Sequence, residues 1–518
     1  MKWLKPWPKK PICIVAMEWD GFGSRCNEIL NALLISKLVE CDFKFTWPKG
    51  EQEILGDIDN KLAYFSQNFI DTHHCDSING RIYNLEVNSE KSITDLQVEM
   101  RKSGFRNFRL SRASRSIPKV KNVDTQPLYR ALGQTIWSQE VWEIKKATEL
   151  IFHSNQVHHS IHIRSGDLLT GAWKQYPDIE KYLPIGIVFN FLEKNSSNKF
   201  AIISDTFEIS EVISKRFHNT ISSSMFHHQI KSSELFVDLQ DLFIMSLGDK
   251  VYAPLSSVYS MLGARLGGTE TSLIYQDFTI EEWKSTFKST IESQTYVEFS
   301  VEVAKKMQAR DISWLVDRLL SQLTGNEFEE ATRIAVEKDD CFVVGLSQYA
   351  VSLLLAGDFL GAERLNSIAI EKADLVTNVH GDPIYYSLVT SLVIQNIKML
   401  CSLDFSKPNM RALHENYSKV FNQHVYQIPK WHQIDPNLRY ALQIIDAFVS
   451  DLQRNPENNL KADLLDDSSF RSKVLDEFQR NMFNKSKYEH FLMHLTNALI
   501  RTMEATIIEP HIRRPQSS

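Results

Sequence analysis

The chain has 518 residues, and because ordinary domains contain about 100 to 200 residues, this length predicts about three structural units. Hydrophobic residues make up 43% and charged residues 24%, which is typical of a folded protein in water and excludes a largely disordered chain. The formal net charge is -6 and the basic residues are dispersed, which excludes the clustered positive surface of a nucleic-acid-binding protein.

Residues 1–11 carry basic charge and tryptophan but lack the apolar core of a signal peptide, and no later run approaches the roughly 20 apolar residues that span a bilayer. The six cysteines show no CxxC pair, which argues against a zinc site and favours a reducing compartment. We therefore expect a cytoplasmic protein. Because tryptophan and lysine favour an anionic lipid surface, two interpretations of residues 1–11 stay open: a flexible leader, or a peripheral contact at the inner face of the membrane.

The first part of the chain alternates strand and helix patterns. Residues 12–17 form a short apolar run, and after a loop with two glycines, residues 24–40 carry apolar side chains at helical spacing. Residues 43–47 supply the next strand, so a βαβ unit opens the chain and predicts a parallel sheet. Residues 51–150 give a weaker pattern, which ends in a predicted helix over 138–152.

A second alternating series begins near residue 160. We expect three strands, at residues 160–163, 199–204 and 250–254. We expect two helices, at residues 232–248 and 256–268. The second helix ends at Gly267 and Gly268, and glycine is the usual residue after a helix C-terminus. The two series together predict two Rossmann-like halves.

From about residue 300 the strand patterns thin out and helical periodicity dominates. Within this region Gly357, Phe359, Ala362 and Ala369 fall where a tetratricopeptide helix pair places its small and aromatic packing residues. Only one such unit is recognisable, whereas a solenoid needs about three repeats. A helical bundle with a single tetratricopeptide-like hairpin is therefore an equally good interpretation.

The sequence HIRSGD places His162, Arg164 and Asp167 where an apolar strand ends. Ligands of open α/β sheets bind outside the carboxyl ends of the strands. An arginine there can hold phosphate oxygens with its planar fork of donors and stabilise a diphosphate as a leaving group. Ser256 and Ser257 lie at another junction of strand and helix, where hydroxyls and free amides bind anions. These two sites predict a bound nucleoside diphosphate.

Two carboxylates of the second series are further candidates. Asp205 follows a predicted strand, and Asp241 lies in the helix before the strand at residue 250. A carboxylate can accept paired hydrogen bonds from the edge of guanine, so either residue could bind the base. No metal site is expected, because only His158 and His162 could share a strand face and no nearby carboxylate completes a set of ligands.

HIRSGD, IISDT and DLFIMSLGDKVYAPLSSVYS, which start at residues 162, 202 and 241, resemble in order and spacing the three motifs of the fucosyltransferase superfamily. This superfamily includes α1,2-, α1,6- and protein O-fucosyltransferases. GFGSRCNEILNALLISK, which starts at residue 21, is similar to the family's glycine-rich first loop. The resemblance covers about residues 10–280 and implies two Rossmann-like domains in a GT-B arrangement and an inverting, metal-independent transfer.

Carried over to this sequence, the resemblance implies a role for each matching residue. Arg164 would contact the β-phosphate of the donor, and Asp167 would orient the loop or assist catalysis. His162 and Asp241 would lie near the guanine, and Asp205 would also line the donor site.

Other residues of the resemblance would surround the same donor. Ser256 and Ser257 would hold phosphate oxygens from the opposite side. Gly21, Gly23 and Arg25 would line the cleft from the first domain.

Three positions depart from the family pattern. Ser165 stands where many members have a second arginine, and Ser24 replaces a common asparagine of the opening loop. The α1,6 branch has a glutamate base a few residues past the motif, but this chain has no carboxylate from Leu168 to Pro177. Three candidates for the general base therefore stay open: Asp167, Asp20 and Glu18.

We expect an α/β fold with a GT-B-like pair of Rossmann-like domains, followed by an all-α C-terminal domain. The expected domains are residues 1–155 on the acceptor side, 156–290 for the nucleotide sugar, and 291–518 for the helices. The resemblance implies a hexosyltransferase of polysaccharide biosynthesis that moves a sugar, with fucose from GDP-fucose the leading choice, onto a glycan hydroxyl without a cofactor.

The expected partners are the nucleotide sugar and the glycan acceptor, and no nucleic acid. An alternative function is a catalytically degenerate transferase fold that serves as a binding or scaffold protein through its helical C-terminal region. That region is also where we expect any protein partner, or a second copy of the chain, to bind.

Overall fold

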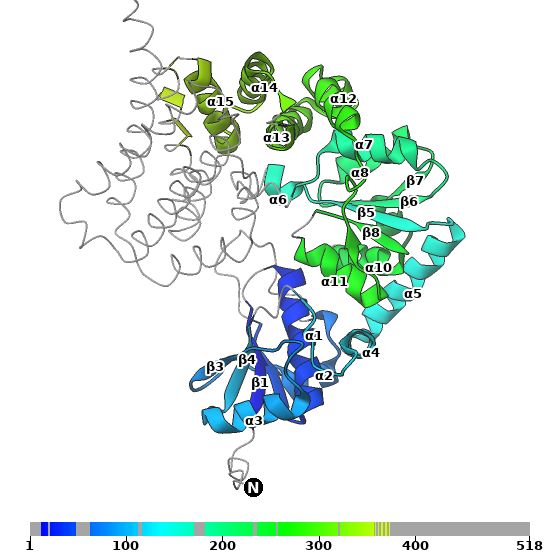
Figure 1. Cartoon of the computed structure of the whole chain (residues 1–518). Helices are drawn as coiled ribbons and strands as arrows, with labels where there is room; N and C mark the ends of the chain where they lie inside the picture. Colours follow the sequence, from blue (N-terminus) through cyan, green and yellow to red (C-terminus); the bar gives the residue numbers. More distant parts are fainter. Residues whose placement is uncertain are drawn as a thin grey trace, which may run out of the picture. The chain divides into compact units, whose positions relative to one another are not determined.

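The structure is a computed structural model that describes residues 12–18, 21–47, 63–111, 116–169, 182–230, 236–254, 257–319 and 322–356, with isolated positions up to 372. The chain divides into two compact units. The first is Met1–Gly166, Glu180–Leu183 and Ile187–Asp277, and the second is Asp167–Ile179, Pro184–Gly186 and Phe278–Ser518. Both sheets labelled in Figure 1 belong to the first unit.

The first sheet has parallel strands in the order β2-β1-β4-β3. Its strands are β1 (Cys13–Ala16), β2 (Asp42–Phe45), β3 (Ile82–Leu85) and β4 (Asn107–Leu110). The helices along this part of the chain are α1 (Phe22–Val39), α2 (Gln67–His73) and α3 (Ile93–Ser103). Because β1 and β4 are neighbours and parallel, the residues at their carboxyl ends lie next to each other at one edge of the sheet.

Helices α4 (Thr125–Gly133) and α5 (Gln139–Ser154) lead from the first sheet to the second. Each begins after a residue whose side chain accepts a hydrogen bond from a backbone N–H of the first turn, Asp124 for α4 and Ser138 for α5. Such N-caps are worth about 1 kcal/mol each, because they satisfy donors that the helix itself leaves unpaired.

The second sheet has parallel strands in the order β7-β6-β5-β8-β9. Its strands are β5 (His159–Ile163), β6 (Phe200–Ser204), β7 (Thr220–Ser222), β8 (Lys250–Tyr252) and β9 (Thr271–Ser272). The chain moves outward from β5 through β6 to β7, and then outward on the other side from β8 to β9. The strand order therefore reverses between β5 and β8, and such a switch point is where open α/β sheets bind ligands.

Among the described residues, six helices follow β5 and precede β9 along the chain: α6 (Gly166–Leu169), α7 (Ile185–Lys194), α8 (Phe207–Arg216), α9 (Ser223–Ile230), α10 (Val237–Leu247) and α11 (Val258–Gly267). Helices α10 and α11 approach closely through glycine. A Cβ on Gly267 would lie 2.2 Å from the Ser246 carbonyl oxygen, and one on Gly263 would lie 2.6 Å from Met245 Cβ. α11 ends as expected, since Gly268 has a φ of 83°.

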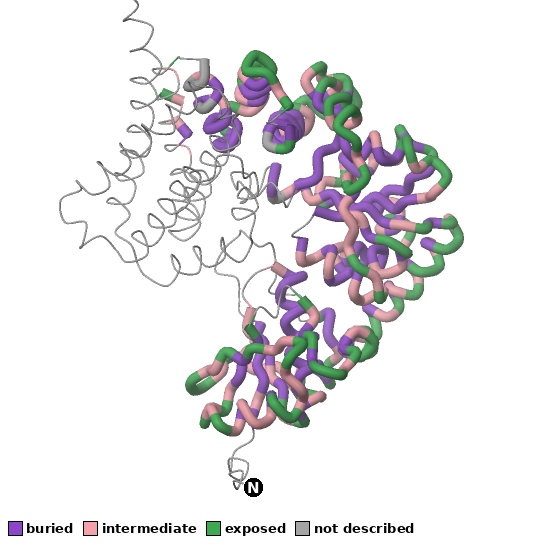
Figure 2. Tube along the Cα trace, in the orientation of Figure 1, coloured by how far each residue is buried: buried purple, intermediate pink, exposed green. Residues whose placement is uncertain are grey.

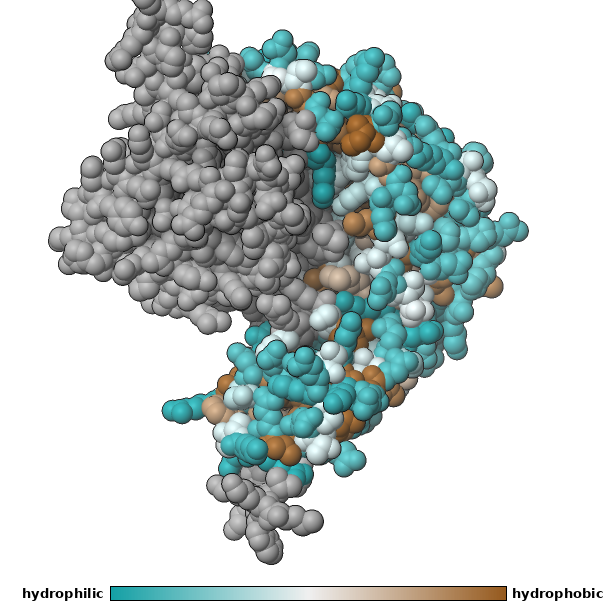
Figure 3. All heavy atoms as spheres, in the orientation of Figure 1, coloured by the Kyte–Doolittle hydropathy of each residue, from teal (hydrophilic) through white to brown (hydrophobic). Residues whose placement is uncertain are grey.

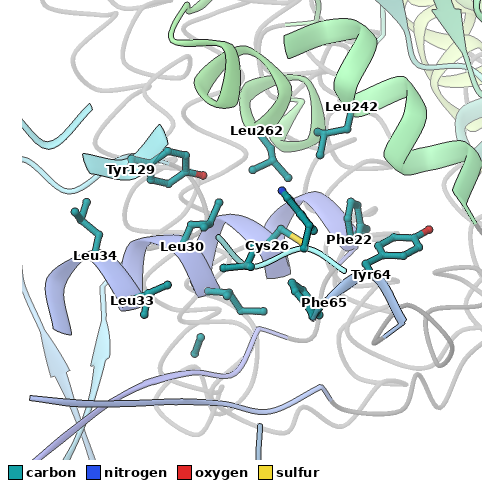
Figure 4. Packing of buried hydrophobic residues seen from close by; sticks show 14 of the residues in the cluster. Phe22, Cys26, Leu30, Leu33, Leu34, Tyr64, Phe65, Tyr129, Leu242 and Leu262 are labelled. Carbon is teal, nitrogen blue, oxygen red and sulfur yellow. The ribbon is translucent and has the colours of Figure 1, made fainter. Parts of the chain in front are cut away.

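Helix α1 joins the cores of the two sheets. It is buried along most of its length rather than on one face, as Figure 2 shows, which is typical of a helix packed on several sides. The α1 side chain of Leu33 points to the side of the helix where Phe65 lies, and Leu242 and Leu262 lie on the opposite side (Figure 4). These residues form part of one continuous apolar cluster, in which each fully buried leucine contributes about 1.5 to 3 kcal/mol.

The described part of the second unit after residue 278 is helical. Its helices are α12 (Ile280–Ile291), α13 (Val301–Leu319), α14 (Gly325–Lys338) and α15 (Val343–Ala356), with a 3-10 turn at Gln294–Tyr296. Successive helices pack on each other. Ala369 is buried, but Gly357, Phe359 and Ala362 lie outside the described residues, so the tetratricopeptide-like hairpin stays a prediction.

Two adjacent residues of α13 bind both flanks of the segment 169–184. Arg310 Nε donates a 2.8 Å hydrogen bond to the Leu168 carbonyl oxygen, and the Asp311 carboxylate accepts one of 3.0 Å from the Ile185 N–H. Tyr296 also donates to Asp311, at 2.6 Å. Both charged side chains are almost completely buried, so these contacts are shielded from water.

The α/β class with two parallel sheets is confirmed, as are the predicted positions of β1, β2, β5, β6 and β8. The three-domain division stays a prediction. On the face drawn in Figure 3, hydrophilic side chains cover most of the described surface. Within the described ranges, no helix combines the length and the apolar character needed to cross a membrane.

Candidate functional site

The end of β5 presents the first part of the candidate site. His162 is buried, and its Nδ1 lies 2.6 Å from Ser260 Oγ. Ser260 Oγ in turn donates to Ser257 Oγ at 2.8 Å, so Nδ1 is the atom of His162 that donates its proton to Ser260. The ring of Tyr259 meets the His162 ring edge-on, with centroids 5.5 Å apart. The carboxyl end of β5 is therefore hydrogen-bonded to the first turn of α11.

Ser257 is the N-cap of α11, and its Oγ accepts from the Ser260 N–H at 3.4 Å. The structure thus brings this predicted residue to the same place as His162, at the switch point between β5 and β8. The N-terminus of α11 carries a partial positive charge from its peptide dipoles, which favours a bound anion. Ser256 lies outside the described residues.

The loop after β5 is fixed by Asp205, which follows β6. Its Oδ1 accepts hydrogen bonds from the Ser165 N–H, the Ser165 hydroxyl and the Gly166 N–H, each at 2.8 Å. Arg164 is half-buried beside this turn. Asp205 therefore has a position from which it supports the loop that carries the predicted phosphate-binding arginine.

The same contacts give a reason for serine at position 165. Ser165 is completely buried, and its Oγ lies 2.8 Å from Ser204 Oγ as well as from Asp205. A longer side chain at position 165 would have to displace these two contacts. Asp167 begins the short helix α6 with Gly166, and its side chain lies outside what the structure describes.

Asp241 is buried in α10 and paired with a residue that the sequence did not single out. Its Oδ1 lies 2.8 Å from His227 Nε2, and both side chains are only 10% exposed. Burial raises the pKa of the Asp241 carboxyl, and the hydrogen bond to His227 opposes part of that rise. His227 lies on α9, fourteen residues earlier, where nothing in the local sequence pattern marks it.

The opening loop occupies the junction between the two sheets. A Cβ on Gly23 would lie 2.6 Å from Tyr259 Cα, so only glycine allows α1 to approach α11 this closely. Gly21 precedes α1, and its carbonyl oxygen accepts from the Ser24 and Arg25 N–H groups at 3.0 and 3.2 Å. Arg25 is buried, with its guanidinium 5.1 Å from the centroid of the Trp47 ring.

A further charged cluster lies at the carboxyl edge of the first sheet. Arg109, on β4, donates from Nε to Glu28 at 2.6 Å and from Nη2 to Glu18 at 3.2 Å. Glu28 also accepts from the Met17 N–H at 2.9 Å. Burial raises the pKa of Glu28, while the charge of Arg109 opposes the rise. Sequence reasoning found Glu18 but missed Glu28 and Arg109.

In the second unit, Asp339, Asp340 and Cys341 place three potential metal-ligand atoms within 4.8 Å of one another. Asp339 is already paired with Arg310 at 3.0 Å, and the other two residues are exposed. Exposed acidic groups of this kind are common without an ion, so this group is not a candidate centre.

No protein-family model and no curated protein matches the sequence. Among solved structures, the chain is similar to that of NodZ alpha-1,6-fucosyltransferase soaked with GDP-fucose, at 12% identity and a TM-score of 0.31 over 50% of this chain and 93% of the other. It is similar to fucosyltransferase NodZ from Bradyrhizobium, at 11% identity and 0.31 over 49% and 93%. It is also similar to POFUT1 in complex with GDP-fucose, at 12% identity and a TM-score of 0.28 over 51% and 96%.

Proposed function

We propose that the protein is an inverting glycosyltransferase that moves fucose from GDP-fucose onto a glycan hydroxyl. The observation that carries this proposal is the position of Arg164. It follows the central strand β5 at the switch point of the second sheet, where the N-terminus of α11 begins with Ser257. A cation beside a helix N-terminus suits a diphosphate, and the HIRSGD motif that contains Arg164 resembles the first fucosyltransferase motif.

In the proposed reaction the acceptor oxygen bonds to the anomeric carbon as the bond from that carbon to the β-phosphate oxygen breaks. The electron pair of the broken bond leaves with GDP, and the proton of the acceptor hydroxyl passes to a base. Arg164 and the α11 N-terminus neutralise the charge that develops on the departing diphosphate, which is where fixed positive groups accelerate a reaction most.

The other residues of the second sheet supply positioning. Asp205 holds the turn that follows Arg164 through three hydrogen bonds. His162 links this turn to Ser257 through Ser260. Asp241, held by His227, offers a carboxylate to the edge of the guanine.

Thermal unfolding with a panel of nucleotides tests the proposal. GDP or GDP-fucose at about 100 times its dissociation constant should raise the unfolding free energy by about 2.7 kcal/mol, whereas ADP at the same concentration should not. A donor screen by mass spectrometry then identifies the transferred sugar. No response to any nucleotide sugar would rule out the enzyme, and binding without turnover would favour a degenerate transferase that acts as a binding protein.

A further inference from the structure

Two carboxylates share one arginine at the carboxyl edge of the first sheet. Glu28 is 1% exposed, whereas the side chain of Glu18 is 15% exposed and that of Arg109 is 32% exposed. The cluster therefore extends from the buried Glu28 toward the surface, and Arg109, which contacts both carboxylates, is its most exposed member.

The need for stability does not account for this cluster. Burying an ion pair costs desolvation that its attraction seldom exceeds, and apolar residues of similar size are often at least as stabilising. Glu28 is nevertheless held in place twice, by Arg109 at 2.6 Å and by the Met17 N–H at 2.9 Å. Two such contacts fix the direction of the Arg109 fork, and thereby the position of Glu18.

The cluster lies beside the part of the chain that meets the second sheet. Glu18 follows β1 and precedes the Gly21 loop by three residues. That loop leads into the first turn of α1, where Gly23 packs on the backbone of Tyr259. The side chain of Asn27 donates to the Val258 carbonyl oxygen at 3.3 Å. The first turn of α1, which begins four residues after Glu18, therefore packs on the first turn of α11, on which the proposed diphosphate site is built.

We propose that Glu18 is the general base of the transfer and that Arg109 and Glu28 are its positioning residues. This inference depends on the proposed function and names the group that function still lacks. Glu18 takes the proton of the acceptor hydroxyl while that oxygen bonds to the anomeric carbon and GDP departs with the electron pair of the broken bond.

Glu28 keeps Arg109 from binding Glu18 too strongly. The Nε contact to Glu28 is 2.6 Å and the Nη2 contact to Glu18 is 3.2 Å, so Glu28 takes the larger share of the guanidinium charge. Among described residues, the charged groups that act on Glu28 are Arg109 and Glu18. Without Glu28, Arg109 would pair with Glu18 alone and oppose its uptake of a proton.

The first test replaces Glu18 with Gln, which keeps its size but removes the base. Transfer to the acceptor should fall about 10²- to 10⁴-fold, the usual contribution of a general base. GDP binding should stay at the wild-type level, because the donor site lies on the second sheet. Glu99→Gln is the matched control, since Glu99 pairs with Lys91 at 2.8 Å in the same unit and is not a member of the cluster of Glu18, Glu28 and Arg109. Its activity should be unchanged.

The second test uses the acid limb of the kcat profile, which a purely structural role would not move. Glu28→Gln removes a negative charge near the base, so the acid limb should shift to lower pH and kcat should fall at constant donor KM. Arg109→Lys keeps the charge and provides a second variant if Glu28→Gln does not fold.

Normal transfer by Glu18→Gln, together with loss of transfer by Asp20→Asn or Asp167→Asn, would place the base elsewhere. Failure of the wild-type protein to bind GDP would instead refute the proposed function. The two failures are therefore distinguishable.

Discussion

The carboxyl edges of the two parallel sheets carry different chemistry. The edge of the first sheet holds Glu18 and Glu28 around a single arginine, Arg109. The edge of the second sheet holds hydroxyls, an imidazole and Arg164, with Asp205 turned toward backbone amides. The first edge is suited to accepting a proton and the second to holding an anion. In the proposed transfer, the two edges would provide the two halves of a displacement reaction.

The largest effect is expected at the second edge. Arg164→Ala should lower transfer about 10³-fold or more and weaken GDP binding, because a fixed positive charge beside the leaving group is lost. Transfer rates and calorimetric titration with GDP measure both effects. Arg216→Ala is a suitable control, since Arg216 lies over the Phe189 ring. A transfer rate of Arg164→Ala equal to that of the wild type would contradict the proposal that this edge binds the diphosphate.

The junction between the edges should be the next most sensitive place. Gly23→Ala puts a methyl group against the Tyr259 backbone, which cannot rotate away, and should cost about 2 to 3 kcal/mol of unfolding free energy. Gly21→Ala is the matched control, because nothing lies within 4 Å of a Cβ there and its φ of -56° suits any residue. Denaturant titration compares the two. Equal stability would show that α1 and α11 can separate freely.

Loss of the loop support should have a smaller effect. Asp205→Ala leaves the Ser165 and Gly166 donors without their acceptor and should cost about 1 to 2 kcal/mol, because Asp205 is itself exposed to water. Donor KM should rise as the turn after Arg164 loosens. Asp205→Asn retains an acceptor oxygen and should lose less. Donor titration of both variants measures the difference, and an unchanged KM in Asp205→Ala would assign the support to other contacts.

The smallest effect concerns pH. Because burial raises the pKa of Asp241 above its ordinary value of 3.8, its contribution to stability is present below that value and is lost as pH rises through the folded-state pKa. Asp241→Asn should therefore lose less stability than the wild type between pH 4 and neutral pH. Hydrogen bonds from Ser92 lower the pKa of Asp95, so its contribution to stability is present above 3.8 and is lost as pH falls through the folded-state pKa. Asp95→Asn should therefore lose less stability than the wild type as pH falls below 3.8. Denaturant midpoints across pH give both slopes.

The elements that could be predicted from the sequence are those whose apolar run or helix-end residues lie within a short stretch of the chain. β6 (FAIIS) is a nearly continuous apolar run, and Ser257 and Gly268 are ordinary helix-end residues. β3 and β4 lie in the region of weaker pattern, where Asn84 and Arg109 interrupt the apolar residues, and they were not predicted. β9 has only two residues.

The missed site residues depend on contacts between distant segments. Glu28 reads as an ordinary acidic residue on a helix, and only the fold brings it to Arg109, 81 residues later. His227 likewise acquires its partner by the packing of α9 on α10. Buried polar residues on α1 are invisible to periodicity, because this helix is packed on several sides.

The neighbouring contacts of Arg310 and Asp311 have a consequence for how the chain can be cut and recombined. One helix turn of α13 binds the carbonyl of Leu168, four residues after Arg164, and the N–H of Ile185. A chain that ends before α13 loses both bonds at once, even though every motif residue is still present. The helical region therefore cannot be replaced without loss of these contacts, and chimaeras should keep α13 together with residues 164–185.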